Sequence, residues 1–216
     1  MTDPTGTDID LEPKNKPRQK RAIETYERVL DVAARLLEAE GVERISTNLI
    51  AEKADVTPPT LYRYFPNKYA VLRALGDRLM QEQNEIFETF LMKSGNSIDA
   101  QMEGTLENLL ETLRVTEQHP GGLAIMRALR AVPTLQQVRL ASHHQVTDGW
   151  VEHLSTLLPG IPKAELWIKA RLTVDIGYAA IEMAMEETNL SSETVLKEAA
   201  LAINAYWGEV ISQSKK

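Results

Sequence analysis

The chain has 216 residues, of which 43% are hydrophobic and 25% are charged, enough for a core and for one or two domains. It contains no cysteine, which excludes disulfides and cysteine-based metal or redox chemistry. No apolar run long enough for a membrane span and no signal-peptide pattern occurs. We therefore expect a soluble, cytoplasmic protein with no membrane partner.

The net charge of −7 is distributed unevenly. Residues 1–13 carry four acids and no bases, and residues 81–216 carry eleven Lys/Arg against eighteen Asp/Glu. Residues 14–80 carry thirteen Lys/Arg against nine Asp/Glu. Positive charge confined to one segment is typical of a nucleic-acid-binding surface, and an acidic remainder would keep the other parts off DNA.

The N-terminal segment, residues 1–19, is predicted to be a disordered stretch followed by a basic arm. Residues 1–13 are poor in apolar side chains and rich in Asp, Thr, Pro and Gly, a composition that favours disorder. The arm comprises Lys14, Lys16, Arg18, Lys20 and Arg21. It would either contact DNA phosphates or a minor groove, or simply be solvated, and the sequence leaves both open.

From Arg21 apolar residues recur at spacings of three and four, which predicts a helix that Gly41 ends. Two short helices joined by a tight turn are then predicted between Ser46 and Lys68. Ser46 is a good N-cap for the first of them. Asp55 falls at the turn, where its tolerance of the left-handed conformation is useful.

The second short helix, about 57–65, has a strong start signal. Thr57 can cap it, and Pro58 and Pro59 suit its first positions because a proline N–H would have no intrahelical partner. Leu61 and Phe65 share one face and should pack inward. This leaves Thr60, Tyr62, Arg63 and Tyr64 for contacts with phosphates and base edges. The alternative is an ordinary helical hairpin whose aromatic residues are core.

The pattern Thr47-x-x-Ile50-Ala51-x-x-Ala54-x-Val56-Thr57-x-x-Thr60-Leu61-Tyr62-x-Tyr64-Phe65-x-Asn67-Lys68 resembles the helix-turn-helix signature of the TetR family of bacterial transcriptional regulators. Two positions depart from the family: Asp55 stands where Gly is usual, and Pro58-Pro59 where many members have Lys-Gly. The resemblance implies a set of DNA-binding residues, in which Arg63 would read a base and Lys68 would hold a phosphate. The set is Thr47, Asn48, Thr57, Pro58, Pro59, Thr60, Tyr62, Arg63, Tyr64 and Lys68.

Further helices are predicted over residues 67–92, 97–117, 123–131, 133–158, 163–187 and 192–212, and no strand-like alternation occurs. The predicted fold is all-α. A three-helix helix-turn-helix domain spans residues 20–67, and a larger helical domain spans residues 68–216. By the resemblance, the larger domain would bind an effector and form the dimer.

The last two helices each have a small-and-apolar face, which would form either a four-helix dimer interface or an intramolecular core. The resemblance favours a dimer. The face comprises Ala170, Val174, Gly177, Tyr178, Ile181, Met185, Val195, Ala199, Ala202, Ile203, Tyr206 and Val210. An effector pocket, again implied by the resemblance, has candidate lining residues that ordinary core packing would also explain: Phe90, Met102, Leu106, Met126, Leu129, Trp150, Leu154, Trp167 and Met183.

No catalytic constellation is found. Adjacent His143 and His144 point about 100° apart on a helix and do not readily share a metal, and no phosphate-binding or nucleophile motif occurs. We expect no enzyme, no metal and no cofactor. The prediction is a homodimeric, sequence-specific DNA-binding regulator, a repressor released from a palindromic operator by a small apolar effector. The alternative is an architectural or adaptor DNA-binding protein without an effector.

Overall fold

The computed structural model describes residues 11, 14 and 17–214. The disorder predicted for residues 1–13 therefore falls, except at residue 11, outside the described residues, as does the predicted role of Lys16. The described chain is helical and has no strand, which confirms the all-α prediction. Its elements are α1 (Lys20–Arg44), α2 (Thr47–Lys53), α3 (Pro58–Tyr62), α4 (Lys68–Ser94), α5 (Ile98–Gln118), α6 (Gly122–Ala131), the 3₁₀ turn η1 (Pro133–Leu135), α7 (Gln136–Leu157), α8 (Lys163–Glu186) and α9 (Ser192–Ser214).

The helices form two compact units. The N-terminal unit contains the described residues up to Leu79 together with His119–Arg139, and the C-terminal unit contains Met80–Gln118 and the chain from Leu140. The units differ from the predicted boundary at residue 67/68 because α6 packs against α1. As a functional division, the boundary at residue 67/68 stays a prediction.

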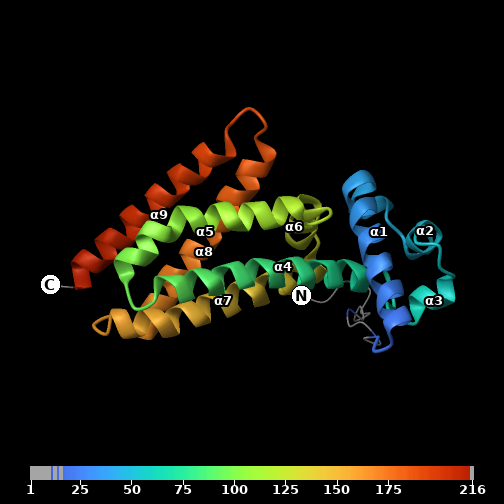
Figure 1. Cartoon of the computed structure of the whole chain (residues 1–216), viewed down its shortest axis with the longest axis horizontal. Coiled ribbons are helices and arrows are strands. Elements are labelled where there is room, and N and C mark those ends of the chain that lie inside the picture. Colours follow the sequence, from blue (N-terminus) through green and yellow to red (C-terminus); the bar gives the residue numbers. More distant parts are fainter. Residues whose placement is uncertain (1–10, 12–13, 15–16, 215–216) are drawn as a thin grey trace. The chain divides into compact units, whose positions relative to one another are not determined.

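In the N-terminal unit α1 contacts α2, and α2 contacts α3 (Figure 1). The predicted N-cap and turn are confirmed: the Ser46 side chain accepts from the Leu49 amide, and Asp55 has a φ of 51°. Two predicted helix ends differ, since α1 continues past Gly41 to Arg44 and α3 ends at Tyr62. Gly41, with a φ of 74°, interrupts α1 before its last turn. Backbone groups at these ends are thus satisfied locally, which fixes where each short helix begins.

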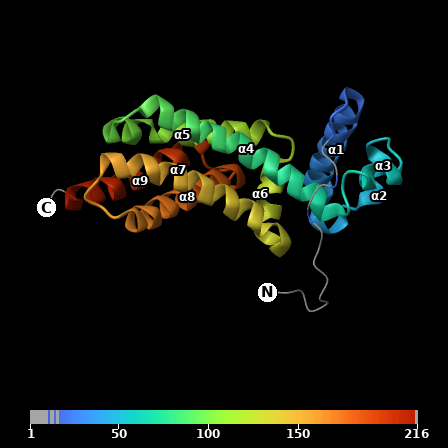
Figure 2. The same ribbon diagram turned by 90° about the horizontal axis from the view of Figure 1, so that it is seen from below.

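In the C-terminal unit α5 packs against both α8 and α9, and α8 packs against α9; Figures 1 and 2 show these helices from two directions. The buried positions of α8 and α9 recur at helical spacing and include Leu166, Ala170 and Val174 on α8 and Ile203 and Trp207 on α9. No helix among the described residues is long and apolar enough to cross a membrane.

Candidate nucleic-acid interface and ligand cavity

The α3 helix is anchored by its apolar residues. Leu61 and Phe65 are fully buried, as predicted, and the Phe65 ring stacks on Tyr26 with centroids 4.9 Å apart. The Thr57 hydroxyl accepts from the Thr60 amide at 3.4 Å and lies 2.9 Å from the Thr60 hydroxyl. Capping and burial together leave the other face of this short helix to solvent.

The exposed face of α2 and α3 is polar. Asn48, Thr57, Pro58, Pro59, Tyr62 and Arg63 are exposed, and Thr47 and Thr60 are partly exposed. The Tyr62 hydroxyl lies 2.9 Å from the Thr47 hydroxyl, so one hydrogen bond joins α2 to α3 across this surface. Eight of the ten predicted DNA-binding residues are therefore brought together on one accessible surface.

Tyr64 corrects the prediction. Its side chain is 2% exposed and packs edge-on against Tyr26, with ring centroids 5.8 Å apart. The Arg63 guanidinium donates to the Tyr64 hydroxyl at 2.8 Å. Tyr64 lies two residues beyond the end of α3 and three after the buried Leu61, a spacing that places its side chain inward, toward Tyr26 of α1. It supports Arg63 from below the surface and is not available to DNA in this arrangement.

The Lys68 side chain already has partners within the subunit, which the sequence did not predict. Its ammonium donates to the Val42 carbonyl at 3.0 Å and lies 5.4 Å from the centroid of the Tyr69 ring. This bond ties the start of α4 to the chain just after the break in α1. An ammonium has two further protons, so a phosphate contact stays a prediction.

One residue of the basic arm is placed beside this surface. The Lys14 amide donates to the Tyr64 carbonyl at 2.9 Å, next to the end of α3. No sequence pattern predicts this contact, because a backbone hydrogen bond depends on chain path rather than on side-chain type. It places Lys14 next to the end of α3.

The C-terminal unit contains a cavity of about 80 Å³. A buried water needs roughly 10–15 Å³ of such space, so the cavity has room for several water-sized groups. The walls include aromatic rings in successive contact: Phe87 with Phe90, Phe87 with Trp150, and Trp150 with Trp207, with centroids 5.2–5.6 Å apart. The lining residues come from α4, α5, α7, α8 and α9.

Three of the nine candidate pocket residues line this cavity: Phe90, Met102 and Trp150. The other six do not, because helix rotation places them elsewhere. Leu154 is core, Met183 is 46% exposed, and Leu106 is partly exposed outside the lining. Trp167 donates to Asp148, while Met126 and Leu129 are core of the N-terminal unit. Sequence reasoning missed the polar lining residues, which are Gln83, Gln101, Thr105, Asn108, Thr112, Thr173 and Asn204.

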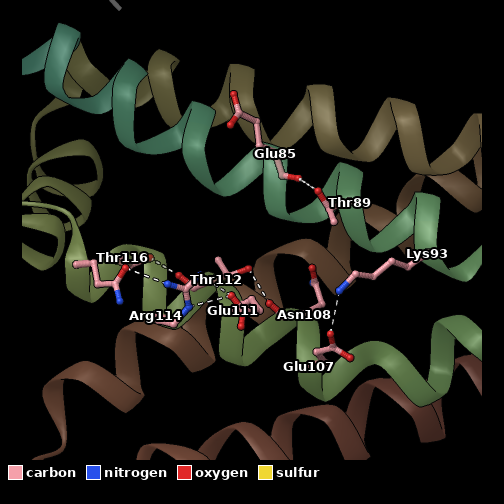
Figure 3. Close-up of polar contacts among 10 residues, drawn as sticks. Glu85, Thr89, Lys93, Glu107, Asn108, Glu111, Thr112, Arg114 and Thr116 are labelled. Carbon is pink, nitrogen blue, oxygen red and sulfur yellow. Dashed lines mark hydrogen bonds and ion pairs between the residues drawn. The ribbon is translucent and has the colours of Figure 1, made fainter.

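A surface groove of about 400 Å³ lies between α4 and α5 and shares Phe90 and Asn108 with the cavity. Figure 3 shows Lys93 of α4 bonded to Glu107 of α5, at 3.1 Å. Both side chains are about two-thirds exposed, so the ion pair contributes little stability and can open readily.

The predicted dimer face also needs correction. Ala170, Val174, Gly177, Tyr178 and Ile181 are buried within the subunit, and all but Ala170 line the cavity. The apolar side chains that α8 exposes lie on the opposite side, at Ile168, Leu172 and Met183, and α9 exposes Leu201. Of the predicted face, Ala202 is exposed, Ile203 and Val210 are buried, and Met185, Val195, Ala199 and Tyr206 are partly exposed.

The histidines form no metal site: the described residues contain no group of three or more His, Asp or Glu placed to hold an ion. His143 is buried, stacks on the Tyr178 ring at 4.3 Å and lies 3.0 Å from the Asp175 carboxylate. Burial acts to raise the pKa of Asp175, but Arg171 and His143 hold it below its usual value. The arrangement is an ion-paired packing contact.

Comparison with known proteins bears on both sites. Residues 29–75, which contain α2, α3 and parts of α1 and α4, match the family described as bacterial regulatory proteins, tetR family. The chain carries the TetR-family helix-turn-helix. That family consists of regulatory DNA-binding proteins rather than enzymes.

Two solved structures share the fold over more than four-fifths of this chain. A TetR-family transcriptional regulator from Streptomyces coelicolor is 23% identical, covers 86% of this chain and 99% of its own, and has a TM-score of 0.61. SmeT, solved as a complex with triclosan, is 19% identical, covers 83% and 91%, and has a TM-score of 0.57. At these identities the likeness concerns the fold.

Among curated proteins, the nucleoid occlusion factor SlmA of Haemophilus ducreyi is 31% identical over 116 residues. The alignment covers 53% of this chain and 55% of that protein, so the chain spans about half the length of this relative.

Proposed function

We propose that the protein is a homodimeric, sequence-specific DNA-binding transcriptional regulator, a repressor that releases a palindromic operator when a small effector binds. The observation that carries the DNA-binding part is the exposed polar surface of α2 and α3 within a segment that matches the TetR family. The net positive charge of residues 14–80 supports it, because it would attract a phosphate backbone.

In this proposal α3 enters a major groove. Arg63 is the residue best suited to base reading, since only a guanidinium offers a two-pronged donor to guanine. Its hydrogen bond to the buried Tyr64 hydroxyl restricts the guanidinium before DNA arrives, which lowers the entropy lost on binding. Thr57 and Thr60 lie at the start of α3, where hydroxyls can reach phosphates or bases.

The homodimer is proposed through the exposed face of α8 and α9, in place of the face predicted from sequence. Ile168, Leu172, Ala179 and Met183 are exposed and follow one another at helical spacing on α8. On α9, Leu201 is 63% exposed. Two such helices meeting their symmetry mates would bury these side chains in a four-helix interface, and two α3 helices would then read half-sites about one DNA turn apart, roughly 34–36 Å.

The effector is proposed to bind the cavity. The α4 helix runs from Lys68, beside α3, to the cavity-lining residues Phe87 and Phe90. A ligand that binds more tightly when α4 is in one position would shift the dimer toward the conformation that has this position. If the two α3 helices lie farther apart in that conformation, the dimer releases the DNA. A neighbour in fold, SmeT, is known as a complex with a small molecule, triclosan, which supports an effector role for the cavity.

A second function is favoured by one specific observation, the match to nucleoid occlusion factor SlmA. A DNA-binding adaptor without an effector would need the helix-turn-helix and the dimer alone. The aromatic-walled cavity favours the regulator, because an adaptor has no use for internal space that costs packing energy.

The test is a gel shift of the protein with DNA from upstream of its own gene, against a scrambled duplex of equal length. We expect a shift that competitor DNA does not remove, and equal binding to both duplexes would overturn the regulator proposal. Operator affinity should fall once a cavity ligand saturates the protein. Unchanged affinity would remove the effector and leave the adaptor function.

A further inference from the structure

Two buried glutamines line the cavity, and in each of them one side-chain amide atom is hydrogen-bonded while the other has no partner among the described residues. Gln101 is 4% exposed, and its Oε1 accepts from the Trp150 Nε1 at 3.0 Å. An indole N–H can only donate, so this bond fixes which end of the amide is oxygen. The Gln101 Nε2 is then a buried donor that has no hydrogen-bond partner among the described residues.

Gln83 presents the opposite group. It is 1% exposed, and its Nε2 donates to the Thr116 hydroxyl oxygen at 2.7 Å. The Thr116 hydroxyl has one proton and donates it to the Thr112 carbonyl, also at 2.7 Å. Toward Gln83 the Thr116 hydroxyl can therefore only accept. The Gln83 Oε1 is therefore a buried acceptor, again without a partner in the described part of the chain.

The remaining polar atoms nearby are largely satisfied. The Thr105 hydroxyl donates toward Asn204, Asn204 donates to the Met102 carbonyl, and Trp207 donates to Thr173. One more acceptor, the Asn108 Oδ1, is buried and unpartnered in the same lining. The cavity thus offers one donor and two acceptors, and buried polar atoms are seldom left unpaired in folded proteins.

The cavity carries no formal charge. Its lining contains no Asp, Glu, Lys, Arg or His, and burial raises the pKa of the Tyr178 phenol well above its usual value. A charged ligand would lose its hydration and find no counter-charge, which is strongly unfavourable. The Phe87, Trp150 and Trp207 rings suit a flat ring instead.

We propose that the cavity binds a neutral, ring-sized molecule that has one polar group able both to donate and to accept, as a carboxamide does. The donor of that group would bond to the Gln83 Oε1, and its acceptor would bond to the Gln101 Nε2. This inference rests on the proposed effector role of the cavity and names the class of effector. It replaces the purely apolar effector predicted from sequence with a molecule that is apolar at one end only.

Four probes with nine non-hydrogen atoms each separate the possibilities: benzamide, its apolar isostere cumene, its anionic isostere benzoate and the cationic benzamidinium. Their binding to the full chain is measured by calorimetry or by ligand-observed NMR. We expect benzamide to bind at least about tenfold more tightly than each of the other three, the effect of one satisfied buried hydrogen-bond pair. Cumene binding as tightly as benzamide, benzoate or benzamidinium binding best, or no binding by any of the four, would each overturn the proposal.

A matched pair of variants locates the effect. Gln83→Met removes the acceptor at nearly constant side-chain length, and Gln81→Met changes an exposed glutamine two residues earlier on α4 whose amide donates to Glu85. We expect Gln83→Met to lose the preference of benzamide over cumene and Gln81→Met to keep it. A preference retained in a folded Gln83→Met, checked by circular dichroism, contradicts the proposal. If that variant does not fold, the four-probe comparison on the unmodified chain decides alone.

These measurements contain no DNA, so a failure of operator recognition would leave them unaffected. Conversely, benzamide binding that leaves operator affinity unchanged would remove the effector role and keep the cavity's ligand class.

Discussion

Gly121, between the His119-Pro120 turn and α6, provides the sharpest structural prediction. Its φ is 68°, and a Cβ added there would lie 2.7 Å from the carbonyl oxygen of Ala34 and 3.2 Å from its carbonyl carbon. Both atoms are α1 backbone, and Ala34 is fully buried. No side-chain rotation can relieve the contact, so Gly121→Ala has to push α6 away from α1.

The loss of unfolding free energy expected for Gly121→Ala has two contributions. A left-handed conformation costs a residue with a Cβ about 1–2 kcal/mol, and forced displacement of packed elements costs about 1–3 kcal/mol. We therefore expect Gly121→Ala to lower the free energy of unfolding by about 2–5 kcal/mol. Gly41→Ala isolates the first part, because Gly41 has a φ of 74° and nothing within 4 Å of its added Cβ. It should cost only about 1–2 kcal/mol.

The assay is urea unfolding followed by far-ultraviolet circular dichroism, with Gly149→Ala as a second control. Gly149 lies inside α7 with open space around its added Cβ, so alanine should stabilise the protein by roughly 0.5–1 kcal/mol. If Gly121→Ala loses no more stability than Gly41→Ala, the close contact between α6 and α1 is refuted.

Three further outcomes are expected. Arg63→Ala should weaken binding to the operator by about 1–3 kcal/mol and relax sequence choice; an equal loss on operator and scrambled DNA in fluorescence anisotropy would make Arg63 a phosphate contact. The pKa of Asp175 is depressed in the folded protein, so its pairing stabilises above the ordinary value of 3.8 and is lost as pH falls through the lower folded value. Asp175→Asn should therefore cost up to about 1 kcal/mol at neutral pH, a small figure because the carboxylate is 49% exposed; urea unfolding that shows the same loss in acid would contradict the pairing. Ile168→Glu, at a 66% exposed position, should shift the protein from dimer to monomer in analytical ultracentrifugation, whereas an unchanged dimer would reject the α8 face.

Local signals predicted the helices and their ends well. Ser46 and Thr57 each cap the helix that they were expected to cap, because a cap depends only on residues within one turn. The inward pair Leu61 and Phe65 follows from spacing alone in the same way. Tyr64 lies three residues after the buried Leu61, and its amide donates to the Leu61 carbonyl as in a helical turn. Side chains at that spacing share a face, so the spacing itself indicates an inward Tyr64, and the predicted outward position was wrong.

The assignment of faces in the C-terminal unit failed for a different reason. Helix α8 is apolar on two sides, and its sequence cannot say which side meets the subunit's own core. The buried polar residues of α5 do follow a pattern that can be recognised in the sequence. Gln101, Thr105, Asn108, Thr112 and Thr116 recur at spacings of three and four along α5, a polar stripe beside the leucine stripe. A polar stripe turned inward indicates a lined cavity or a hydrogen-bonded network rather than a solvated face.

The most direct test of DNA reading by α2 and α3 is selection of bound duplexes from a random pool by the purified protein, followed by sequencing. We expect enrichment of a pseudo-palindrome whose half-sites lie about one helical turn, 10–10.5 base pairs, apart. Loss of that enrichment is expected for a folded Arg63→Ala. A pool that stays random with the unmodified protein, or a motif that survives unchanged in the variant, would contradict this assignment.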